Sequence, residues 1–237
     1  MLLDAVSVFK DMRDDQRGKL EHGGTILSPG DGETVFAQGD PADAVYAILH
    51  GDGHVRIGAV DRHAKALMVE VFRAGDIFGE IGVIDGGPRT AWAVAEGRVR
   101  LMRIPNTMFL AHVAASPDLA AALCRLMARR LRRTFELFQD ATFEKLEVRL
   151  ARQILYLAER EGRPAEGGIR LANRFRQADL ADLLGTTTRS VITILNNWRA
   201  AKIVVYDTDR AFLTIQDAAA LRGIIAGRRV TRSADSP

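Results

Sequence analysis

The stretch FGEIGVIDGGPRTA, residues 78–91, decides how the first half of the chain is interpreted. It places Glu80 directly after Gly79, and Arg89 directly after a Gly-Gly-Pro turn. A short helix that begins at Gly79 leaves its first amide N–H groups unpaired, and these groups together with the helix dipole favour an anion. Gly79 and Gly82 would let a ligand approach the backbone closely. Arg89 can pair bidentately with a phosphate, which lysine cannot do.

The two side chains next in importance, Glu80 and Thr90, suggest what accompanies the phosphate. Glu80 repels a phosphate but can accept a hydrogen bond from a sugar hydroxyl, and Thr90 offers a hydroxyl to a phosphate or a base. Together with Arg89 they predict a site for a sugar phosphate. The alternative is an internal Glu80–Arg89 ion pair that closes a tight turn. The residues alone leave both interpretations open.

The sequence around this stretch, residues 23–104, consists of short β-branched or alternating runs. Pro-Gly, Gly-Asp and Gly-Asp-Gly turn signals separate the runs. This texture predicts a sandwich or barrel-like roll of about eight strands. Before it, residues 4–21 have the apolar spacing of a short helix, with Val8, Phe9, Met12 and Leu20 on one side. Trp92, at the end of the stretch, is expected in the core.

Residues 118–142 are expected to form one long helix, because they contain no Gly or Pro. Its apolar stripe repeats in alternating steps of four and three, the heptad pattern of a coiled-coil seam. The stripe consists of Ala120, Cys124, Met127, Leu131, Thr134, Phe138 and Ala141. A narrow seam flanked by arginines favours a two-helix dimer interface, and the alternative is a core helix packed on the roll. A second helix is expected from about 144 to 161, before Gly162 and Pro164.

The stretch RQADLADLLGTTTRSVITILNNWRAAKIV, residues 176–204, has the pattern of a helix-turn-helix. Ala181 is small where two helices cross, and Gly185 falls where the turn needs a positive φ. Thr186 or Thr187 can cap the second helix, and a hairpin wing follows with Trp198 packed beneath it. The residues predicted to reach DNA are Gln177, Thr187, Thr188, Arg189, Ser190 and Thr193. The alternative is an ordinary helical hairpin with a glycine turn.

Charge and composition limit the classes of function. The chain has 237 residues with a net charge of +3, but residues 1–116 carry −4 and residues 168–237 carry +5. A basic final third fits a nucleic-acid contact there. The one cysteine, Cys124, cannot form an internal disulfide or a cysteine-rich metal site, and a reducing cytoplasm is the simplest location. We find no signal peptide or transmembrane run.

Over nearly its whole length the chain resembles the CRP/FNR family of bacterial transcription regulators. The resemblance rests on GD at 39–40, GDIFGEIGVIDGGPRTAW at 75–92, MARRL at 127–131 and the helix-turn-helix. It implies that Gly79, Glu80 and Ile81 contact the phosphate and ribose of a cyclic nucleotide and that Arg89 pairs with the cyclic phosphate. Thr90 then lies beside the phosphate, Thr134 reaches the purine, and Arg130 packs toward the pocket.

Three departures from the family pattern bear on specificity. Phe135 stands where the family usually has a serine supplied across the dimer, and a phenyl ring can stack on a purine but cannot donate to it. Thr90 replaces a serine, and threonine there is typical of many cyclic-GMP-binding domains. Cyclic GMP is therefore expected to bind at least as well as cyclic AMP. Thr188, Arg189 and Thr193 differ from the family's base-reading residues, so a different operator is expected.

These inferences define an α+β protein with four parts. Residues 1–116 form a cyclic-nucleotide-binding β-roll (a double-stranded β-helix or jelly roll), 117–143 a dimerisation helix, and 144–227 a winged helix-turn-helix; 228–237 are expected to be disordered. The expected function is a homodimeric, cyclic-nucleotide-responsive regulator, with inverted-repeat DNA and RNA polymerase as partners and no cofactor or metal. Alternatives are a family member that responds to another effector or needs none, and a cupin-like metal enzyme suggested by His50 and His54.

Overall fold

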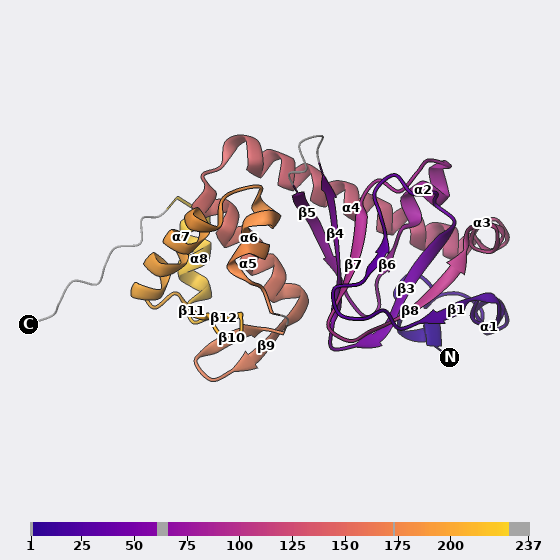
Figure 1. Cartoon of the computed structure of the whole chain (residues 1–237), viewed down its shortest axis with the longest axis horizontal. Coiled ribbons are helices and arrows are strands. Elements are labelled where there is room, and N and C mark those ends of the chain that lie inside the picture. The colour runs from indigo at the N-terminus through magenta and orange to yellow at the C-terminus, as the bar shows by residue number, and fades with distance from the viewer. Residues whose placement is uncertain (1, 61–65, 173, 228–237) are drawn as a thin grey trace, which may run out of the picture. The chain divides into compact units, whose positions relative to one another are not determined.

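The computed structural model describes residues 2–60, 66–172 and 174–227, and the expected disordered tail, 228–237, lies outside these residues. The described residues belong to two compact units that divide within one long helix, after Thr134. Both units, and the long helix that they share, are drawn in Figure 1.

The first unit contains eight strands in two four-stranded antiparallel sheets, which confirms the predicted strand roll. One sheet has the order β1-β8-β3-β6 and the other β2-β7-β4-β5. The strands are β1 Thr25–Leu27, β2 Thr34–Phe36, β3 Ala44–Gly51, β4 His54–Val60, β5 Ala66–Phe72, β6 Ile77–Phe78, β7 Trp92–Glu96 and β8 Val99–Pro105. The helices of this unit are η1 Leu2–Ala5, α1 Asp14–Gly23, α2 Glu80–Asp85 and α3 Asn106–Ala115, together with the first part of α4 Pro117–Phe143.

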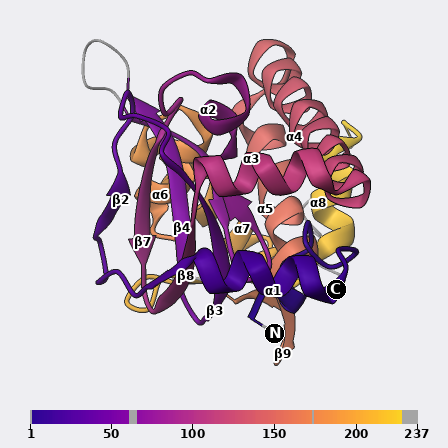
Figure 2. The ribbon, with the colours of Figure 1, turned by 90° about the vertical axis from the view of Figure 1, so that its right-hand side faces the viewer.

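Strand β3 is buried on both faces, because its alternating side chains enter two different cores. Tyr46 and Ile48 point into the roll between the two sheets. Val45, Ala47 and Leu49 point the other way, into a second core with α1, α3 and the start of α4. In Figure 2, α1 and α3 lie side by side across this sheet.

The N-terminal segment corrects one expectation. Residues 4–21 were expected to form a helix, but α1 begins only at Asp14, and the preceding residues form a 3-10 turn and bends. Val8, Phe9 and Met12 are nevertheless buried, so their spacing reflects packing of an irregular segment onto the sheet. Trp92 is only half-buried and lies against Gly58 of β4, where an added Cβ would come within 2.1 Å of the indole ring.

The second unit contains the end of α4 and the predicted helix-turn-helix with its wing. Its elements are α5 Leu146–Glu161, β9 Gly162–Ala165, β10 Gly168–Leu171, α6 Gln177–Leu184, α7 Thr188–Ala200, β11 Val204–Asp207, β12 Phe212–Ile215 and α8 Ala218–Ile225. The four strands form one antiparallel sheet in the order β11-β12-β10-β9.

No single helix among the described residues is both long and apolar enough to cross a membrane. Helices α3 and α4 have that length and composition only together, as a pair bent by 110°.

Candidate functional site

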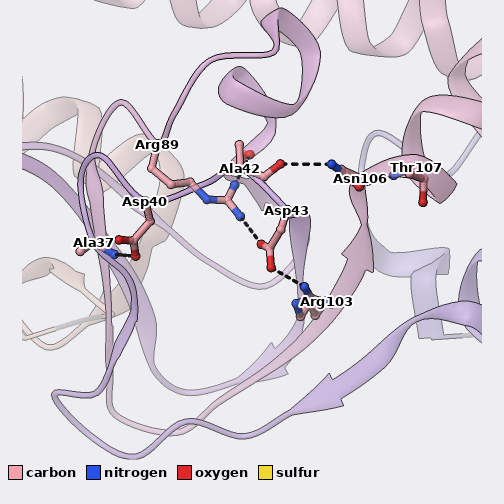
Figure 3. A network of polar contacts seen from close by, with 9 residues as sticks. Ala37, Asp40, Ala42, Asp43, Arg89, Arg103, Asn106 and Thr107 are labelled. Atoms are coloured by element: carbon pink, nitrogen blue, oxygen red, sulfur yellow. Dashed lines mark hydrogen bonds and ion pairs between the residues drawn. The ribbon is translucent and has the colours of Figure 1, made fainter.

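Arg89 is a buried cation at the centre of the first unit's candidate site. It lies on the segment between α2 and β7, and its side chain enters the roll with 3% of the residue exposed. One terminal nitrogen donates to the Gly79 carbonyl at 2.6 Å, and the other donates to the Asp43 carboxylate at 3.2 Å (Figure 3). The guanidinium also lies over the Phe36 ring, 4.3 Å from its centroid. Its Nε has no hydrogen-bond partner among the described residues.

Asp43 connects Arg89 to a second arginine. Its other carboxylate oxygen accepts from Arg103 of β8 at 2.6 Å, and the Asp43 side chain remains 58% exposed. Figure 3 shows Asp43 between the two guanidinium groups. The hydrogen bond to Asp43 raises the pKa of Arg103 above its usual value. Asp43 was not among the predicted site residues, although the sequence places this carboxylate directly before a long apolar strand.

Gly79 meets two separate requirements for glycine. Its φ of 77° is in the left-handed region, where it starts α2, and an added Cβ would lie 2.7 Å from Nη1 of Arg89. Gly82 was expected to make room for a ligand beside the backbone, and the structure shows a different reason for the glycine. An added Cβ there would meet the Gly87 and Pro88 carbonyls at 2.6 and 2.8 Å, so the close approach at Gly82 comes from the chain's own backbone.

Glu80 and Arg130 form a second buried pair. Glu80 is 1% exposed, and Oε1 lies 2.6 Å from Nη1 of Arg130 on α4. Arg130 also donates to the Ile77 carbonyl at 2.5 Å, and its guanidinium lies 4.4 Å from the centroid of Phe72. Glu80 therefore pairs with Arg130 and Arg89 pairs with Asp43, in place of the Glu80–Arg89 pair considered from the sequence. Oε2 of Glu80 is buried, and no residue in ranges 2–60, 66–172 and 174–227 forms a hydrogen bond with it.

An aromatic cluster separates the two arginines. Tyr46 and Phe78 are stacked at 5.2 Å, and Phe72 and Phe78 are stacked at 6.4 Å. Phe36 lies against Tyr46 and Phe78, with ring centroids 5.7 and 5.9 Å away. Arg89 is at the Phe36 end and Arg130 at the Phe72 end, so aromatic faces shield both cations from water. The alternating sequence pattern predicted these aromatic residues only as apolar residues of strands, and it did not predict their contacts with the two arginines.

The structure brings together Gly79, Glu80, Arg89 and Arg130 of the predicted site residues. Thr90 is exposed next to Arg89, and Ile81 is 44% exposed on α2. Thr134 is exposed on α4, and its hydroxyl donates to the Arg130 carbonyl at 3.0 Å. Phe135 is 60% exposed and belongs to the second unit.

The predicted helix-turn-helix of the second unit is formed by α6 and α7. Gly185 ends α6 with a φ of 60°, and the Thr187 hydroxyl caps α7 by accepting from the Ser190 amide. Val191, Leu195 and Trp198 form the buried side of α7. The indole of Trp198 donates to Glu147 of α5 at 3.0 Å. The wing, β11 and β12, follows directly and packs against α7.

The outer side of α7 carries the residues expected to reach DNA. Thr188, Arg189 and Thr193 are exposed. The Thr193 hydroxyl donates to the Arg189 carbonyl at 2.9 Å, and the Ser190 hydroxyl lies 2.8 Å from that of Thr187. Gln177 is the first residue of α6 and is half-buried. Arg189 is thus the longest of the predicted polar side chains on this side of α7.

Each of the two candidate sites lies in a part of the chain that matches a known protein domain. The model of the cyclic nucleotide-binding domain matches residues 28–116, and that of the Crp-like helix-turn-helix domain matches residues 148–224. The CRP-like cAMP-activated global transcriptional regulator of Mycobacterium tuberculosis is 34% identical over 160 residues, which are 68% of this chain and 70% of that protein. The chain belongs to the CRP/FNR family of transcription regulators.

Two further comparisons give the breadth of this CRP/FNR assignment. The global nitrogen regulator of Synechococcus elongatus is 25% identical over 181 residues, 76% of this chain and 81% of that protein. The crystal structure of a CRP/FNR-family transcriptional regulator from Thermus thermophilus has the same fold, with a TM-score of 0.70. The identity is 23%, over 86% of this chain and 100% of that chain. This CRP/FNR chain is accordingly a DNA-binding transcription regulator with a cyclic nucleotide-binding domain.

The comparisons decide against the cupin-like enzyme, since the Mycobacterium tuberculosis relative is a transcriptional regulator. The two histidines that suggested it are in different environments. His54 is buried and lies 3.2 Å from Glu96, whereas His50 is exposed and lies 3.2 Å from Arg100. Among the residues that the structure describes, no three His, Cys, Asp or Glu side chains form a group suited to a metal ion.

In this CRP/FNR chain, the start of α4 is a core helix, and the rest of α4 carries exposed apolar side chains. Leu119, Ala122 and Leu123 are buried in the core of the first unit. Farther along, large apolar side chains are exposed on the single chain. These are Leu131 at 58%, Phe135 at 60%, Phe138 at 66% and Phe143 at 80% exposure. Of the other seam residues, Cys124 and Ala141 are exposed, and Met127 is half-buried.

Proposed function

We propose that this CRP/FNR protein is a homodimeric transcription factor that binds a cyclic purine nucleotide inside its β-roll. The observation that carries the proposal is that two buried polar atoms have no partner in residues 78–91, which we call the cassette. Within the part of the chain that the structure describes, Nε of Arg89 and Oε2 of Glu80 are buried without a hydrogen-bond partner. Buried polar atoms are nearly always hydrogen-bonded, so these two are the groups that a sugar phosphate would complete.

In the proposed complex, each cassette residue has a distinct role. Arg89 pairs with the cyclic phosphate, and Gly79 gives the backbone room beside it. Glu80 accepts from the ribose hydroxyl, with Ile81 next to it at the start of α2. Thr90 lies beside the phosphate. Thr134 and Phe135 on α4 approach the purine, and Arg130 holds Glu80 in place.

The nucleotide base is the finer part of the proposal. The Thr90 hydroxyl can accept from the guanine amino group, which adenine lacks, and this favours cyclic GMP as at least an equal ligand. The Mycobacterium tuberculosis relative is described as cAMP-activated, which instead favours cyclic AMP. The proposal includes no cofactor other than this nucleotide. The proposed protein acts in the cytoplasm, where it binds its DNA and contacts RNA polymerase.

Dimerisation and DNA binding belong to the same proposal. The exposed apolar stripe of α4 supports a homodimer through Cys124, Met127, Leu131, Thr134, Phe138 and Ala141. Two copies would present two α7 helices to an inverted repeat, with Arg189 as the main base-reading residue and Gln177, Thr187, Thr188, Ser190 and Thr193 around it.

A second candidate is a family member that responds to a different effector or to none. One observation favours it: Asp43 already supplies Arg89 with an anionic partner. The charge of the buried arginine is therefore compensated without a nucleotide, as a protein with no cyclic nucleotide would require.

Calorimetric titration of the purified protein with cyclic AMP and cyclic GMP separates the two candidates. Arg89→Ala should lower the affinity at least thirtyfold, since a buried charged hydrogen bond is worth roughly 2–5 kcal/mol. Thr90→Ala should weaken cyclic GMP more than cyclic AMP, by about 0.5–1.5 kcal/mol. Absence of heat with either nucleotide would favour the second candidate, and a strong preference for cyclic AMP would refute the role of Thr90.

A further inference from the structure

The sheet of the second unit has one face that the helix-turn-helix does not use. On β12, Leu213 and Ile215 are buried, so Phe212 and Thr214 lie on the opposite, outer face. Arg170 of β10 pairs with Thr214 across the sheet, and Arg163 of β9 pairs with Arg170. Because residues directly opposite each other in a sheet share a face, both arginines lie on this outer face.

Two guanidinium groups are held over one aromatic ring on this face. The guanidinium carbons of Arg170 and Arg174 lie 5.7 and 5.6 Å from the ring centroid of Phe212. Such contacts with an aromatic face restrict arginine side chains while leaving their N–H donors available. We call Arg170, Arg174 and Phe212 the Phe212 cluster.

Asp207 is the carboxylate opposite Phe212 across the sheet, and its Oδ1 accepts from the Asp209 and Arg210 amides. Within the described residues, neither Arg170 nor Arg174 forms an ion pair, whereas neighbouring Arg176 pairs with Asp179 at 3.0 Å. Arg163 adds a third exposed positive charge to the same face. Like charges this close repel each other, so the face is suited to an anionic partner.

The cluster adjoins the first helix of the helix-turn-helix. The Phe175 amide donates to the Ala211 carbonyl at the turn of the wing, and the Tyr206 hydroxyl donates to the Phe175 carbonyl, both at 2.9 Å. These bonds fix the segment that carries Arg174 between the wing and the start of α6 at Gln177. In helix-turn-helix complexes, the first helix crosses the DNA backbone. Because α6 is that helix here, phosphates of bound DNA would lie close to the segment that carries Arg174.

We propose that the Phe212 cluster binds phosphates of duplex DNA outside the bases that α7 reads. The inference rests on the proposed DNA binding and extends it to a second surface. Arg170 and Arg174 each neutralise one phosphate, and Phe212 holds both guanidinium groups in position. Such contacts add affinity and salt dependence but no base preference.

The test measures operator binding against salt concentration by fluorescence anisotropy, with an operator selected from random DNA. Each contacted phosphate contributes about 0.9 to the slope of log affinity against log salt. A dimer on the operator loses two phosphate contacts for each substitution, so Arg170→Ala and Arg174→Ala should each lower the slope by about two. The double variant should lower it by about four, with the selected motif unchanged. Arg222→Ala, an exposed arginine on α8 of the same unit, should leave the slope as it is.

Two further measurements keep the outcome unambiguous. Arg170→Lys with Arg174→Lys keeps both charges and should restore most of the slope. Trimming the duplex to the bases read by α7 should lower the wild-type slope to that of the double alanine variant. If wild type binds the operator specifically and the double variant keeps its slope, the cluster does not contact DNA, although the proposed function stands. If wild type binds no DNA specifically, both proposals fail.

Discussion

Arg89 is a buried cation whose charge is compensated before any ligand arrives. Asp43 accepts one of its N–H groups, and the Gly79 carbonyl accepts another. A buried charge without a partner costs several kcal/mol, so this contact stabilises the folded protein. Asp43 is itself tied to Arg103 and largely exposed, so it can keep a partner and water when Arg89 turns to a phosphate.

Replacing Asp43 should therefore separate stability from affinity. In Asp43→Asn, Arg89 loses its anionic partner only in the unliganded protein, so the thermal midpoint without nucleotide should fall. The nucleotide would then no longer compete with a carboxylate, and its affinity should rise about tenfold, or about 1.4 kcal/mol. Thermal melts and calorimetry measure the two effects.

The matched control for this prediction is Asp52→Asn, which removes the partner of Arg98 from an exposed pair at 2.9 Å in the same unit. Exposed pairs contribute little, so neither quantity should change appreciably. Weaker nucleotide binding in Asp43→Asn would contradict the prediction, because it would mean that Asp43 positions Arg89 in the bound state.

At the scale of elements, α4 changes its surroundings along its length. Its first turns bury Leu119, Ala122 and Leu123 against the roll, whereas Leu131 and Phe138 remain exposed. An exposed apolar stripe with heptad spacing on a long helix is suited to a second copy of the same helix. Each Leu or Phe side chain that becomes fully buried contributes about 1.5–3 kcal/mol.

The combined change Leu131→Glu and Phe138→Glu should make the protein monomeric. It removes two apolar contacts per chain and places like charges opposite each other in the seam. Light scattering at micromolar concentration should give the mass of one chain, and specific DNA binding should be lost. Arg132→Glu with Gln139→Glu adds glutamates at exposed positions of α4 outside the seam and should remain dimeric. A dimer that survives the seam variant would place the interface elsewhere.

The long periodic elements were predictable from sequence because their signals are local. The heptad run predicted α4 within one residue at each end, and the cap at Thr187 and the turn at Gly185 predicted the boundary between α6 and α7. Residues 4–21 failed because apolar spacing indicates burial, and an irregular segment can bury Val8 and Phe9 equally well. The partners of Arg89 and Glu80 could not be predicted, since these pairs form across 46 and 50 residues and depend on tertiary packing.

At the scale of the whole molecule, α4 is the element that both units share. Arg130 ties it to Glu80 of the cassette in the first unit. Asp140 ties it to Arg152 of α5 in the second unit. A ligand that binds Oε2 of Glu80 would therefore act on a carboxylate that also restrains a helix continuing into the DNA-binding unit. For such a ligand to regulate DNA binding, it must bind two arrangements of the protein with different affinity.

The symmetry of a dimer also predicts the form of the operator. If two copies pair through α4, their α7 helices are related by a two-fold axis, so the operator should be an inverted repeat with half-site centres about 34 Å apart. Arg189 is exposed near the start of α7, and Arg189→Ala should relax one base position per half-site at a cost of about 1–3 kcal/mol. Arg199→Ala, near the other end of α7, should leave the selected motif unchanged. Selection on random DNA with each variant measures this, and an identical motif with and without Arg189 would mean that other residues read the bases.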